Sequence, residues 1–408
     1  MAKLLWTQRS NFGPSPRAGS AMAYDSARNR AVLYGGAGNS PLMDTWEWDG
    51  SFWTQMEDTG PSERMNCSMA YDNSRKVSIL FGGMNAQAMG DTWEWDGTNW
   101  TQLADSGPHP RWGHAMAFDS IRNRTVLFAG QSADNNRFSD TWEFDGENWT
   151  QQQDAGPAPR AFHCMAYDIA AKRVVMFGGI NAQVDATMLG DTWAWDGGEW
   201  VQLAEFGPLA RSRAGMASTG QGTVLYGGLA SANAAQLPQA DTWEFGGKLW
   251  IQRQDIGPGP LQGASMVFDS GRNVAVLFGG QAIAVQDEQA AGPARFSGST
   301  WECPVAPPVP VSVSSISLGV HPPVPSDTPV ALTITLSGPA PASGAIVTFS
   351  GPVYAPNGAT LTPVTIAPGL TTTTIEVAFS AFLFGGIVTI YAQTAGTQAA
   401  SLVVQLQP

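Results

Sequence analysis

The sequence has little charge, little cysteine and little histidine. Only 13% of its 408 residues are charged, and the net charge of −13 at pH 7 argues against a nucleic-acid partner. No apolar run reaches the length of a membrane span. Three cysteines at unrelated spacings give no disulfide framework. With four histidines and no phosphate loop, nucleophile elbow or zinc spacing, we expect no cofactor.

A secretory signal is not evident either. Such a signal needs an apolar stretch of roughly 7–15 residues. Here the apolar run extends only from Leu4 to Trp6, and Thr7-Gln8-Arg9 follows it. The sequence therefore predicts that Trp6 and its neighbours belong to the folded structure.

Internal repetition is the strongest feature that the sequence does have. The motif Asp-Thr-Trp recurs with close relatives at 44–50, 91–97, 140–146, 191–197, 241–247 and, in a reduced form, 299–303. Successive copies are 47 to 58 residues apart. Each copy lies in a unit with a Gly-Pro turn, a strand such as SAMAYD, a polar hairpin, a strand such as AVLYGG, a variable loop and a final WTQ strand. Four short strands in a unit of this length are typical of a propeller blade.

The paired glycines that end the second strand carry a resemblance to a known family. They stand at 35–36, 82–83, 178–179, 227–228 and 279–280, with Ala129-Gly130 as a variant. With the aromatic residues that follow them, these units resemble kelch repeats over residues 4 to about 303. The resemblance implies an all-β fold, a six-bladed kelch β-propeller over 1–303. It says little about function, because kelch propellers include enzymes, scaffolds and adhesins.

The opening residues complete this pattern. Five units end with Trp-Thr-Gln or a close relative, at Trp53, Trp100, Trp149, Trp200 and Trp250. The sixth unit stops at Cys303 without such a strand, whereas Trp6-Thr7-Gln8 supplies one from the other end of the sequence. We expect the N-terminal strand to close the sixth blade and remove two open sheet edges.

Two charged positions change together between the units. Five units have arginine at the start of the first strand and aspartate at the start of the third: Arg17 and Asp44, Arg64 and Asp91, Arg111 and Asp140, Arg160 and Asp191, Arg211 and Asp241. In the sixth unit these positions are Leu261 and Ser299. The joint loss predicts one internal ion pair per blade, absent from the sixth. The alternative is that these charges surround the channel mouth and bind a ligand.

A binding site is expected where the loops between second and third strands lie. These loops lengthen along the chain from 7 to 18 residues, and the longest spans 281–298, including Arg295 and Phe296. Trp112 is the one tryptophan outside the repeat positions. With Met65, Phe162 and Arg213, it could form an aromatic and cationic recess suited to a sugar or peptide. His114 and His163 are further candidates, with packing between blades as the alternative.

The last quarter of the chain has a different character. The stretch 304–312, PVAPPVPVS, is typical of a stiff linker. Seven Thr/Val/Ile-rich runs over 313–408 predict an Ig-like β-sandwich, and they resemble the Ig-like modules of bacterial surface and secreted proteins. No Lys or Arg follows Arg295, and Asp327 and Glu376 are the acidic residues beyond 303. Such a surface tends to associate, either in self-association or in docking, with a weakly charged spacer as the alternative.

Two functions fit these features. The first is a non-enzymatic binding and assembly protein whose loop face recognises a protein or glycan. Its Ig-like domain would dock to a larger surface, an appendage or a phage-like particle. We expect an extracellular, surface- or particle-associated location, with the cytoplasm as the alternative. The second function is a carbohydrate-active kelch enzyme, oxidase- or mutarotase-like. Galactose oxidase, which this chain resembles in domain order, implies a copper site of two histidines, two tyrosines and a cysteine cross-linked to tyrosine.

Overall fold

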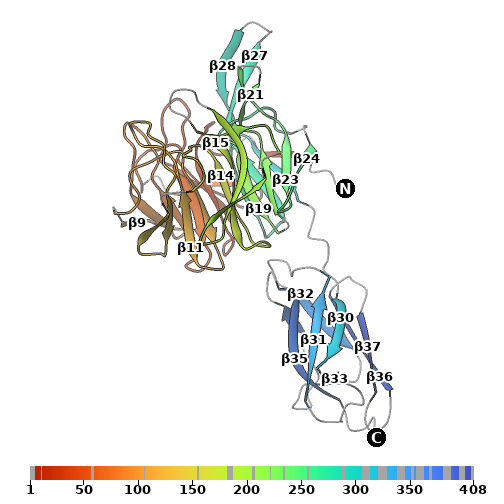
Figure 1. Cartoon of the computed structure of the whole chain (residues 1–408). Helices are drawn as coiled ribbons and strands as arrows, with labels where there is room; N and C mark the ends of the chain where they lie inside the picture. The colour runs from red at the N-terminus through yellow and green to blue at the C-terminus, as the bar shows by residue number, and fades with distance from the viewer. Residues whose placement is uncertain are drawn as a thin grey trace. The chain divides into compact units, whose positions relative to one another are not determined.

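The computed structural model is built from β-strands (Figure 1). It describes residues 5–10, 12–56, 59–104, 106–153, 156–181, 187–204, 207–220, 222–232, 235–254, 257–286, 290–305, 313–319, 329–337, 345–350, 353–354, 363–366, 370–379, 387–394 and 400–405. Within these residues, no helix has the length and apolar character needed to cross a membrane. The chain divides into two compact units, Met1–Ala306 and Pro307–Pro408, and each is described by itself.

The first unit contains antiparallel four-stranded sheets that follow the sequence repeats. Sheet 1 has β2 (Ala21–Asp25), β3 (Arg30–Tyr34), β4 (Thr45–Trp48) and β5 (Trp53–Gln55). Sheet 2 has β6 (Ser68–Asp72), β7 (Val77–Phe81), β8 (Thr92–Trp95) and β9 (Trp100–Ala104). Sheet 3 has β10 (Ala115–Asp119), β11 (Arg124–Phe128), β12 (Thr141–Phe144) and β13 (Trp149–Gln153).

The later units keep this order. Sheet 4 has β14 (Cys164–Asp168), β15 (Arg173–Ile180), β16 (Met188–Trp195) and β17 (Trp200–Ala204). Sheet 5 has β19 (Gly215–Thr219), β20 (Gly222–Tyr226), β23 (Thr242–Phe245) and β24 (Trp250–Gln254). Sheet 6 has β25 (Ser265–Asp269), β26 (Val274–Phe278), β29 (Thr300–Pro304) and β1 (Thr7–Ser10).

Smaller sheets extend from the loops between second and third strands. One consists of β18 (Arg211–Ser212), β21 (Leu229–Ala232) and β22 (Ala235–Pro238), and another of β27 (Gln281–Gln286) and β28 (Ala290–Phe296). These hairpins project from one end of the unit in Figure 1. We call this end the loop face, and the end formed by the turns between first and second strands the opposite face.

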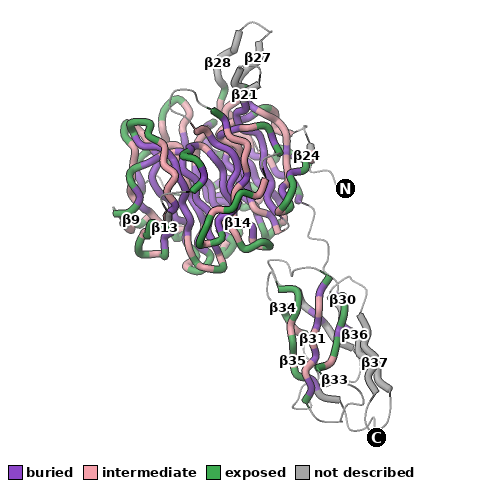
Figure 2. The backbone as a smooth tube through the Cα atoms, in the orientation of Figure 1, coloured by how far each residue is buried: buried purple, intermediate pink, exposed green. Residues whose placement is uncertain are grey.

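The innermost strands pack around a common axis. β2 packs against β6, β6 against β10, β10 against β14, β14 against β19, β19 against β25, and β25 against β2 again. Between sheets lie clusters of buried apolar side chains, so that buried residues fill the centre of the unit and exposed ones its rim (Figure 2). This closed succession of antiparallel sheets fits a kelch propeller.

The paired glycines are required by backbone contact between neighbouring sheets. Gly35 has a φ of +63°, and a Cβ atom there would lie 2.6 Å from the carbonyl oxygen of Arg64 in the next sheet. L-residues other than glycine rarely adopt this left-handed conformation. The glycine therefore lets two sheets meet directly, and the next glycine, Gly36, donates its N–H to the same oxygen at 2.9 Å.

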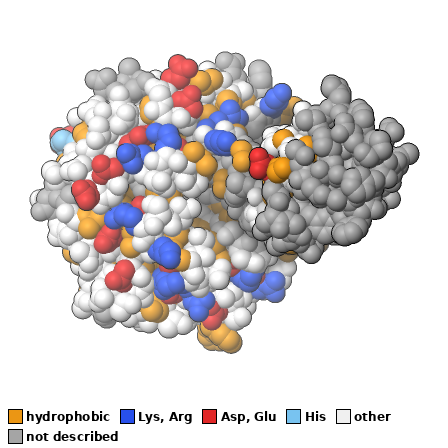
Figure 3. Space-filling model, turned by 90° about the horizontal axis from the view of Figure 1, so that it is seen from below, with side chains coloured by type: hydrophobic (Ala, Val, Ile, Leu, Met, Phe, Trp, Pro, Cys, Tyr) orange, Lys and Arg blue, Asp and Glu red, His pale blue; other side chains and the backbone are white. Residues whose placement is uncertain are grey.

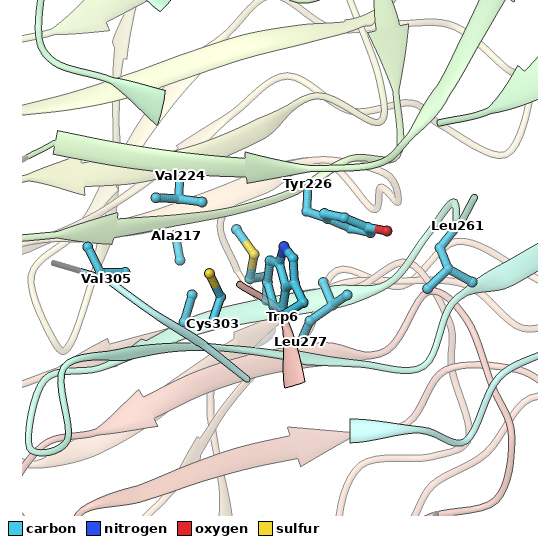
Figure 4. Packing of buried hydrophobic residues seen from close by; sticks show 10 residues of the cluster. Trp6, Ala217, Val224, Tyr226, Leu261, Leu277, Cys303 and Val305 are labelled. Carbon is cyan, nitrogen blue, oxygen red and sulfur yellow. The ribbon is translucent and has the colours of Figure 1, made fainter. Parts of the chain in front are cut away.

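The N-terminal strand occupies the outer position of sheet 6, as the missing sixth Trp-Thr-Gln predicted. β1 pairs antiparallel with β29, with Thr7 opposite Glu302 and Gln8 opposite Trp301. The indole of Trp6 lies among Tyr226, Leu277 and Cys303 (Figure 4). It donates a hydrogen bond to the hydroxyl of Thr242 in sheet 5 at 2.9 Å.

Every unit repeats this contact. In each case the first tryptophan of an outer strand donates its indole N–H to a threonine of the preceding sheet, at 2.6–2.9 Å: Trp53 to Thr300, Trp100 to Thr45, Trp149 to Thr92, Trp200 to Thr141 and Trp250 to Thr192. Trp6 therefore performs the same task as the other five. The hydrogen bond from Trp53 to Thr300 joins sheet 1 to sheet 6 and so connects the two ends of the series.

The second unit has two four-stranded sheets. One has the order β30 (Val313–Leu318), β31 (Val330–Leu336), β35 (Thr372–Phe379) and β33 (Val353–Tyr354). The other has the order β34 (Val364–Ile366), β32 (Ala345–Ser350), β36 (Ile387–Thr394) and β37 (Ala400–Gln405). The sequence predicted seven strands here, and the two-residue β33 brings the number in the described residues to eight. Most of the predicted linker, 306–312, lies outside the described residues, as does Asp327.

Candidate functional site

A ring of backbone hydrogen bonds surrounds the mouth of the central channel on the loop face. One residue from each sheet or its leading turn donates its N–H to the carbonyl oxygen of the equivalent residue in the preceding unit, at 2.6–2.9 Å: Gly19, Asn66, Gly113, Phe162, Arg213 and Gly263. The N–H of Gly19 donates to Gly263, which closes the ring. We call these six residues the mouth ring.

All six residues of the mouth ring have left-handed backbone conformations, with φ between +55° and +66°. Glycine and asparagine adopt this conformation at low cost, whereas a bulky side chain there costs roughly 1–2 kcal/mol. Phe162 and Arg213 are the bulky residues of the ring. Because backbone strain of this kind concentrates at functional sites, these two residues are the foremost candidates for ligand binding.

The side chains of Phe162 and Arg213 form a stack at the mouth. The Arg213 guanidinium lies 3.9 Å from the centroid of the Phe162 ring. On the other side, the ring of Trp112 meets Phe162 edge to face, with centroids 5.2 Å apart. The stack thus joins the leading turns of sheets 3, 4 and 5 and brings together three of the residues predicted from sequence.

Arg213 is a cation that lies against an aromatic ring and has no anionic partner in the part of the chain that the structure describes. No hydrogen bond or ion pair joins its guanidinium to another of the described residues. Burial lowers the pKa of Arg213, but a guanidinium remains protonated in proteins at neutral pH. A half-buried cation of this kind attracts an anionic group of a ligand. The aromatic surface beside it suits an apolar or planar part of the same ligand.

The predicted histidines lie one residue inside the mouth ring. His114 and His163 are only 5% and 7% exposed and line the channel, whose free volume is about 200 Å³. Their rings pack edge to face on Phe81 and Phe128 of the preceding sheets, at centroid distances of 5.4 and 5.6 Å. Both rings therefore take part in the packing between sheets while they also line the channel, and a ligand role for them stays a prediction.

The environment keeps both imidazoles neutral. Burial, helped by the charge of Arg111, lowers the pKa of His114 to about 3. Burial and the charge of Arg160 lower the pKa of His163 well below its ordinary value. Among the described residues, no ring nitrogen of either histidine has a hydrogen-bond partner. The Phe81 carbonyl opposes the shift of His114 electrostatically, without meeting the geometry of a hydrogen bond.

Met65, Arg295 and Phe296 lie on the other side of the mouth. Met65, Arg213 and Phe296 line a hollow of about 310 Å³ next to the channel. Arg295 and Phe296 line a further hollow of about 550 Å³ beside the loop 38–40. The structure therefore places the residues of the predicted recess in two groups: a stack of Trp112, Phe162 and Arg213, and a hollow that Met65 shares with Arg213.

The five arginines and five aspartates that the sequence grouped together are paired within each sheet. The guanidinium of Arg17 donates to both carboxylate oxygens of Asp44, at 2.5 and 2.8 Å, and to the Gly35 carbonyl at 3.0 Å. The equivalent two-point contacts join Arg64 to Asp91, Arg111 to Asp140, Arg160 to Asp191 and Arg211 to Asp241, at 2.5–2.9 Å. The arginine side chains are 0–1% exposed.

These ion pairs occupy the guanidinium groups of all five paired arginines, while the side chains of the five aspartates remain 15–23% exposed. Burial alone would raise the pKa of Asp44, but the hydrogen bond and charge of Arg17 outweigh it and lower that pKa. The same balance lowers the pKa of Asp91, Asp191 and Asp241. In sheet 6, Leu261 replaces the arginine and packs in the cluster around Trp6.

A second charge network lies at the opposite face, and the sequence reasoning missed it. In sheet 1, Arg28 binds Asp25 at 2.7 Å and both oxygens of Glu47 at 2.6 and 2.9 Å. Glu47 in turn accepts the indole N–H of Trp95 from sheet 2 at 3.0 Å. Arginines bind in the same way to an aspartate and a glutamate in sheets 2, 3 and 6, at Arg75, Arg122 and Arg272. Figure 3 views the unit from this side and shows acidic and basic side chains interspersed.

The copper site of galactose oxidase does not fit these residues. Both channel histidines pack on phenylalanines, and the Tyr34 hydroxyl donates to the backbone carbonyl of Pro61. Among the described residues, no three His, Cys, Asp or Glu side chains come together in a group that could hold a metal ion. The donor set that the resemblance implied is therefore not brought together.

One comparison with known proteins finds a match. Residues 92–280 match the family model of the KLHDC2/KLHL20/DRC7 Kelch-repeats domain. This segment runs from the third strand of sheet 2 to the paired glycines of sheet 6. No curated protein matches the chain. The match and the repeated four-stranded sheets together support a kelch-repeat protein, which implies a β-propeller scaffold for protein interaction.

Proposed function

We propose that the chain is a non-enzymatic binding and assembly protein with a six-bladed kelch propeller. Its loop face binds a protein or glycan at the channel mouth. The C-terminal unit, which we assign as an Ig-like sandwich, docks the propeller to a larger surface, an appendage or a phage-like particle. The protein would then act outside the cell or as part of a particle.

The stack at the mouth carries this proposal. Phe162 and Arg213 occupy left-handed positions that glycine fills in three of the six units and asparagine in another. Substituting glycine at these positions would relieve strain, so their bulky side chains favour a role beyond folding. Together they offer an unpaired cation and an aromatic ring at the entrance of a rigid scaffold, where binding residues are commonly found.

A double variant, Phe162→Gly/Arg213→Asn, tests the binding role. Both new residues occur at the equivalent position in other units of this chain, so we expect the fold to be kept. Wild-type protein and this double variant are compared on a glycan array and a peptide array, with melting temperature as the check on folding. We expect ligands of the wild type to be lost. Arg124→Gln serves as the matched control, because among the described residues the Arg124 guanidinium bonds the backbone carbonyl of Asn123 alone. Ligands bound equally by the double variant would contradict the proposal.

The docking role of the C-terminal unit requires a separate measurement. Light scattering of the full chain across protein concentrations should show assemblies larger than the 43.2 kDa monomer. The weak charge of this unit supports that expectation, because little electrostatic repulsion opposes association. A monomer at every concentration would remove self-association and leave docking to a different partner to be tested.

A further inference from the structure

Three adjoining hollows lead from the channel mouth to the outer edge of the loop face. The channel shares Gly19, Asn66 and Arg213 with the hollow of about 310 Å³. That hollow shares Phe296 and the loop 38–40 with the hollow of about 550 Å³. We call the second and third hollows, which meet at Phe296, the Phe296 groove. It lies where sheet 6 meets sheet 1.

An arginine stands in each part of this groove. Arg213 lines the part next to the channel and Arg295 the outer part. Neither guanidinium has a hydrogen bond or an ion pair with another of the described residues. No carboxylate is found among the described residues that line either hollow. Within the described part of the groove, two cations therefore have no carboxylate beside them, in a chain of net charge −13.

The surface between the arginines is aromatic and neutral. The half-buried Phe296 lines both hollows, as do the neutral residues Asn39 and Ser40. Hollows of these volumes match the range of small-molecule sites, roughly 300–1,000 Å³. Such sites combine an apolar surface with a few charged groups that fix the ligand's orientation. The groove has this composition, and its two charges are at separate places along it.

We infer that the Phe296 groove binds a small organic dianion. One anionic group of this ligand reaches Arg213, the other reaches Arg295, and an apolar or planar body lies on Phe296. The inference rests on the proposed binding role of the loop face and specifies a ligand class for it. Carboxylates suit both ends, because a guanidinium binds a carboxylate through two parallel hydrogen bonds.

Backbone strain strengthens the inference at the inner end. Arg213 holds its left-handed conformation, and its guanidinium is fixed over the Phe162 ring at 3.9 Å. A guanidinium held in place loses less conformational entropy when it binds a carboxylate. The inner site is thus preorganised, whereas Arg295 is exposed and gains order only with the ligand.

Calorimetry with simple diacids tests this on the full chain. The probes are terephthalate and its longer biphenyl analogue, with benzoate as the monoanion and the diamide of terephthalate as the neutral control. We expect one of the diacids to bind at least about tenfold more tightly than benzoate, since a second charge-assisted contact is added. The diamide should not bind. Raising the ionic strength should weaken diacid binding more than benzoate binding.

Substitutions assign the two ends. Arg213→Asn and Arg295→Gln should each reduce diacid affinity to about that of benzoate, and Arg295→Lys should keep part of the gain because the charge remains. Arg124→Gln should change nothing. Equal affinities for diacids and benzoate would overturn the inference, as would a diacid affinity that is the same in the wild type and in Arg295→Gln.

The failure of this inference can be told apart from failure of the proposed function. If benzoate binds and Arg213→Asn abolishes its binding while diacids gain nothing, the dianion is wrong and anion recognition at the mouth stands. If no probe binds the wild type, the dianion is again wrong, and the array comparison of wild type with the Phe162→Gly/Arg213→Asn variant decides the proposed function alone.

Discussion

The two faces of the propeller unit carry different charge systems. On the loop face, a two-point arginine–aspartate pair is present in sheets 1 to 5 and is replaced by Leu261 and Ser299 in sheet 6. On the opposite face, an arginine bound to aspartate and glutamate is present in sheets 1, 2, 3 and 6. Sheet 4 has Ala171 and Ala194 at the arginine and glutamate positions, so it keeps neither residue.

This difference shows that each face is specialised independently. The loop face lost its ion pair at sheet 6, and the Phe296 groove lies between that sheet and sheet 1. The opposite face lost its network elsewhere, where Val201 and Ile251 are exposed on outer strands that have threonine in other units. In sheet 6 of the loop face, arginine and aspartate disappear together, because a buried charge left without its partner is strongly destabilising. In sheet 4 of the opposite face, arginine and glutamate are replaced by alanine, whereas the buried Asp168 remains and accepts the backbone N–H groups of Ala170 and Ala171.

The largest expected effect comes from breaking a loop-face pair. Arg111→Leu leaves Asp140 without its cation at a site where the arginine is fully buried, so we expect a loss of about 3–5 kcal/mol. Urea unfolding measures it. The double variant Arg111→Leu/Asp140→Ser copies sheet 6 and should recover most of the loss. A double variant as unstable as the single one would show that the pair is needed for more than charge balance.

A smaller loss is expected on the opposite face. Arg122→Ala removes the cation that is bonded to the buried carboxylates of Asp119 and Glu143. Because the Arg122 side chain is 28% exposed, water weakens the attraction between these charges. We expect a loss of about 2 kcal/mol in the same unfolding experiment. Adding Glu143→Ala and Trp195→Phe to Arg122→Ala gives the contact between sheets 3 and 4 the residues that sheets 4 and 5 have at the equivalent positions, which are Ala171, Ala194 and Phe245. We expect this triple variant to recover the lost stability. If Arg122→Ala lowered the free energy of unfolding as much as Arg111→Leu does, the two charge systems would contribute equally to stability and this expectation would be wrong.

The channel histidines should give a smaller effect that depends on pH. Because both are held neutral when folded, the unfolded chain binds more protons below its ordinary histidine pKa of about 6.5. Stability should therefore fall from about pH 6.5 downward, until His114 itself titrates at about 3. The slope is up to about 1.4 kcal/mol per pH unit for each histidine. His114→Gln and His163→Gln should each flatten the unfolding free energy between pH 6.5 and 5; an unchanged slope in the double variant would show that other groups are responsible.

The smallest effect concerns the strained residue of the mouth ring. Arg213→Gly should leave the protein as stable as the wild type, or more stable by up to about 1 kcal/mol, because the left-handed backbone favours glycine. Calorimetric melting measures this. Gly113→Arg, at an equivalent position, is the matched reverse variant and should destabilise. A marked loss in Arg213→Gly would mean that the guanidinium supports the fold and would weaken the binding role.

The repeat units made much of the fold accessible from sequence. The Trp-Thr-Gln strands indicated where β1 would pair, since a sixth copy was missing beside Cys303. The joint change to Leu261 and Ser299 pointed to contacts between two positions of one unit, and the structure places those side chains together in the other five. Such inferences succeed because equivalent residues in repeats meet equivalent surroundings.

Other features depend on contacts between units that the repeat pattern does not contain. The glycines at 19, 113 and 263, with Asn66, were a signal of a left-handed backbone position, but the sequence does not show that six such residues bond to one another. The same joint-loss argument could have found the Arg122 network, from Asp-x-x-Arg in four units. Met65 and Phe296 line one hollow although they are more than two hundred positions apart, and periodicity alone cannot predict that they lie there together.

The position of β1 also affects how the chain is synthesised. Arg9 and Glu302, which are bonded across β1 and β29, are 293 positions apart. At roughly 5–20 residues per second, a ribosome needs about 15–60 s to make the intervening chain. During that time β1 lacks its partner strand β29, and Trp48 and Trp53 of sheet 1 lack the sheet 6 residues that cover them. The nascent chain therefore exposes aromatic surface of sheet 1 until the strands of sheet 6 have been made.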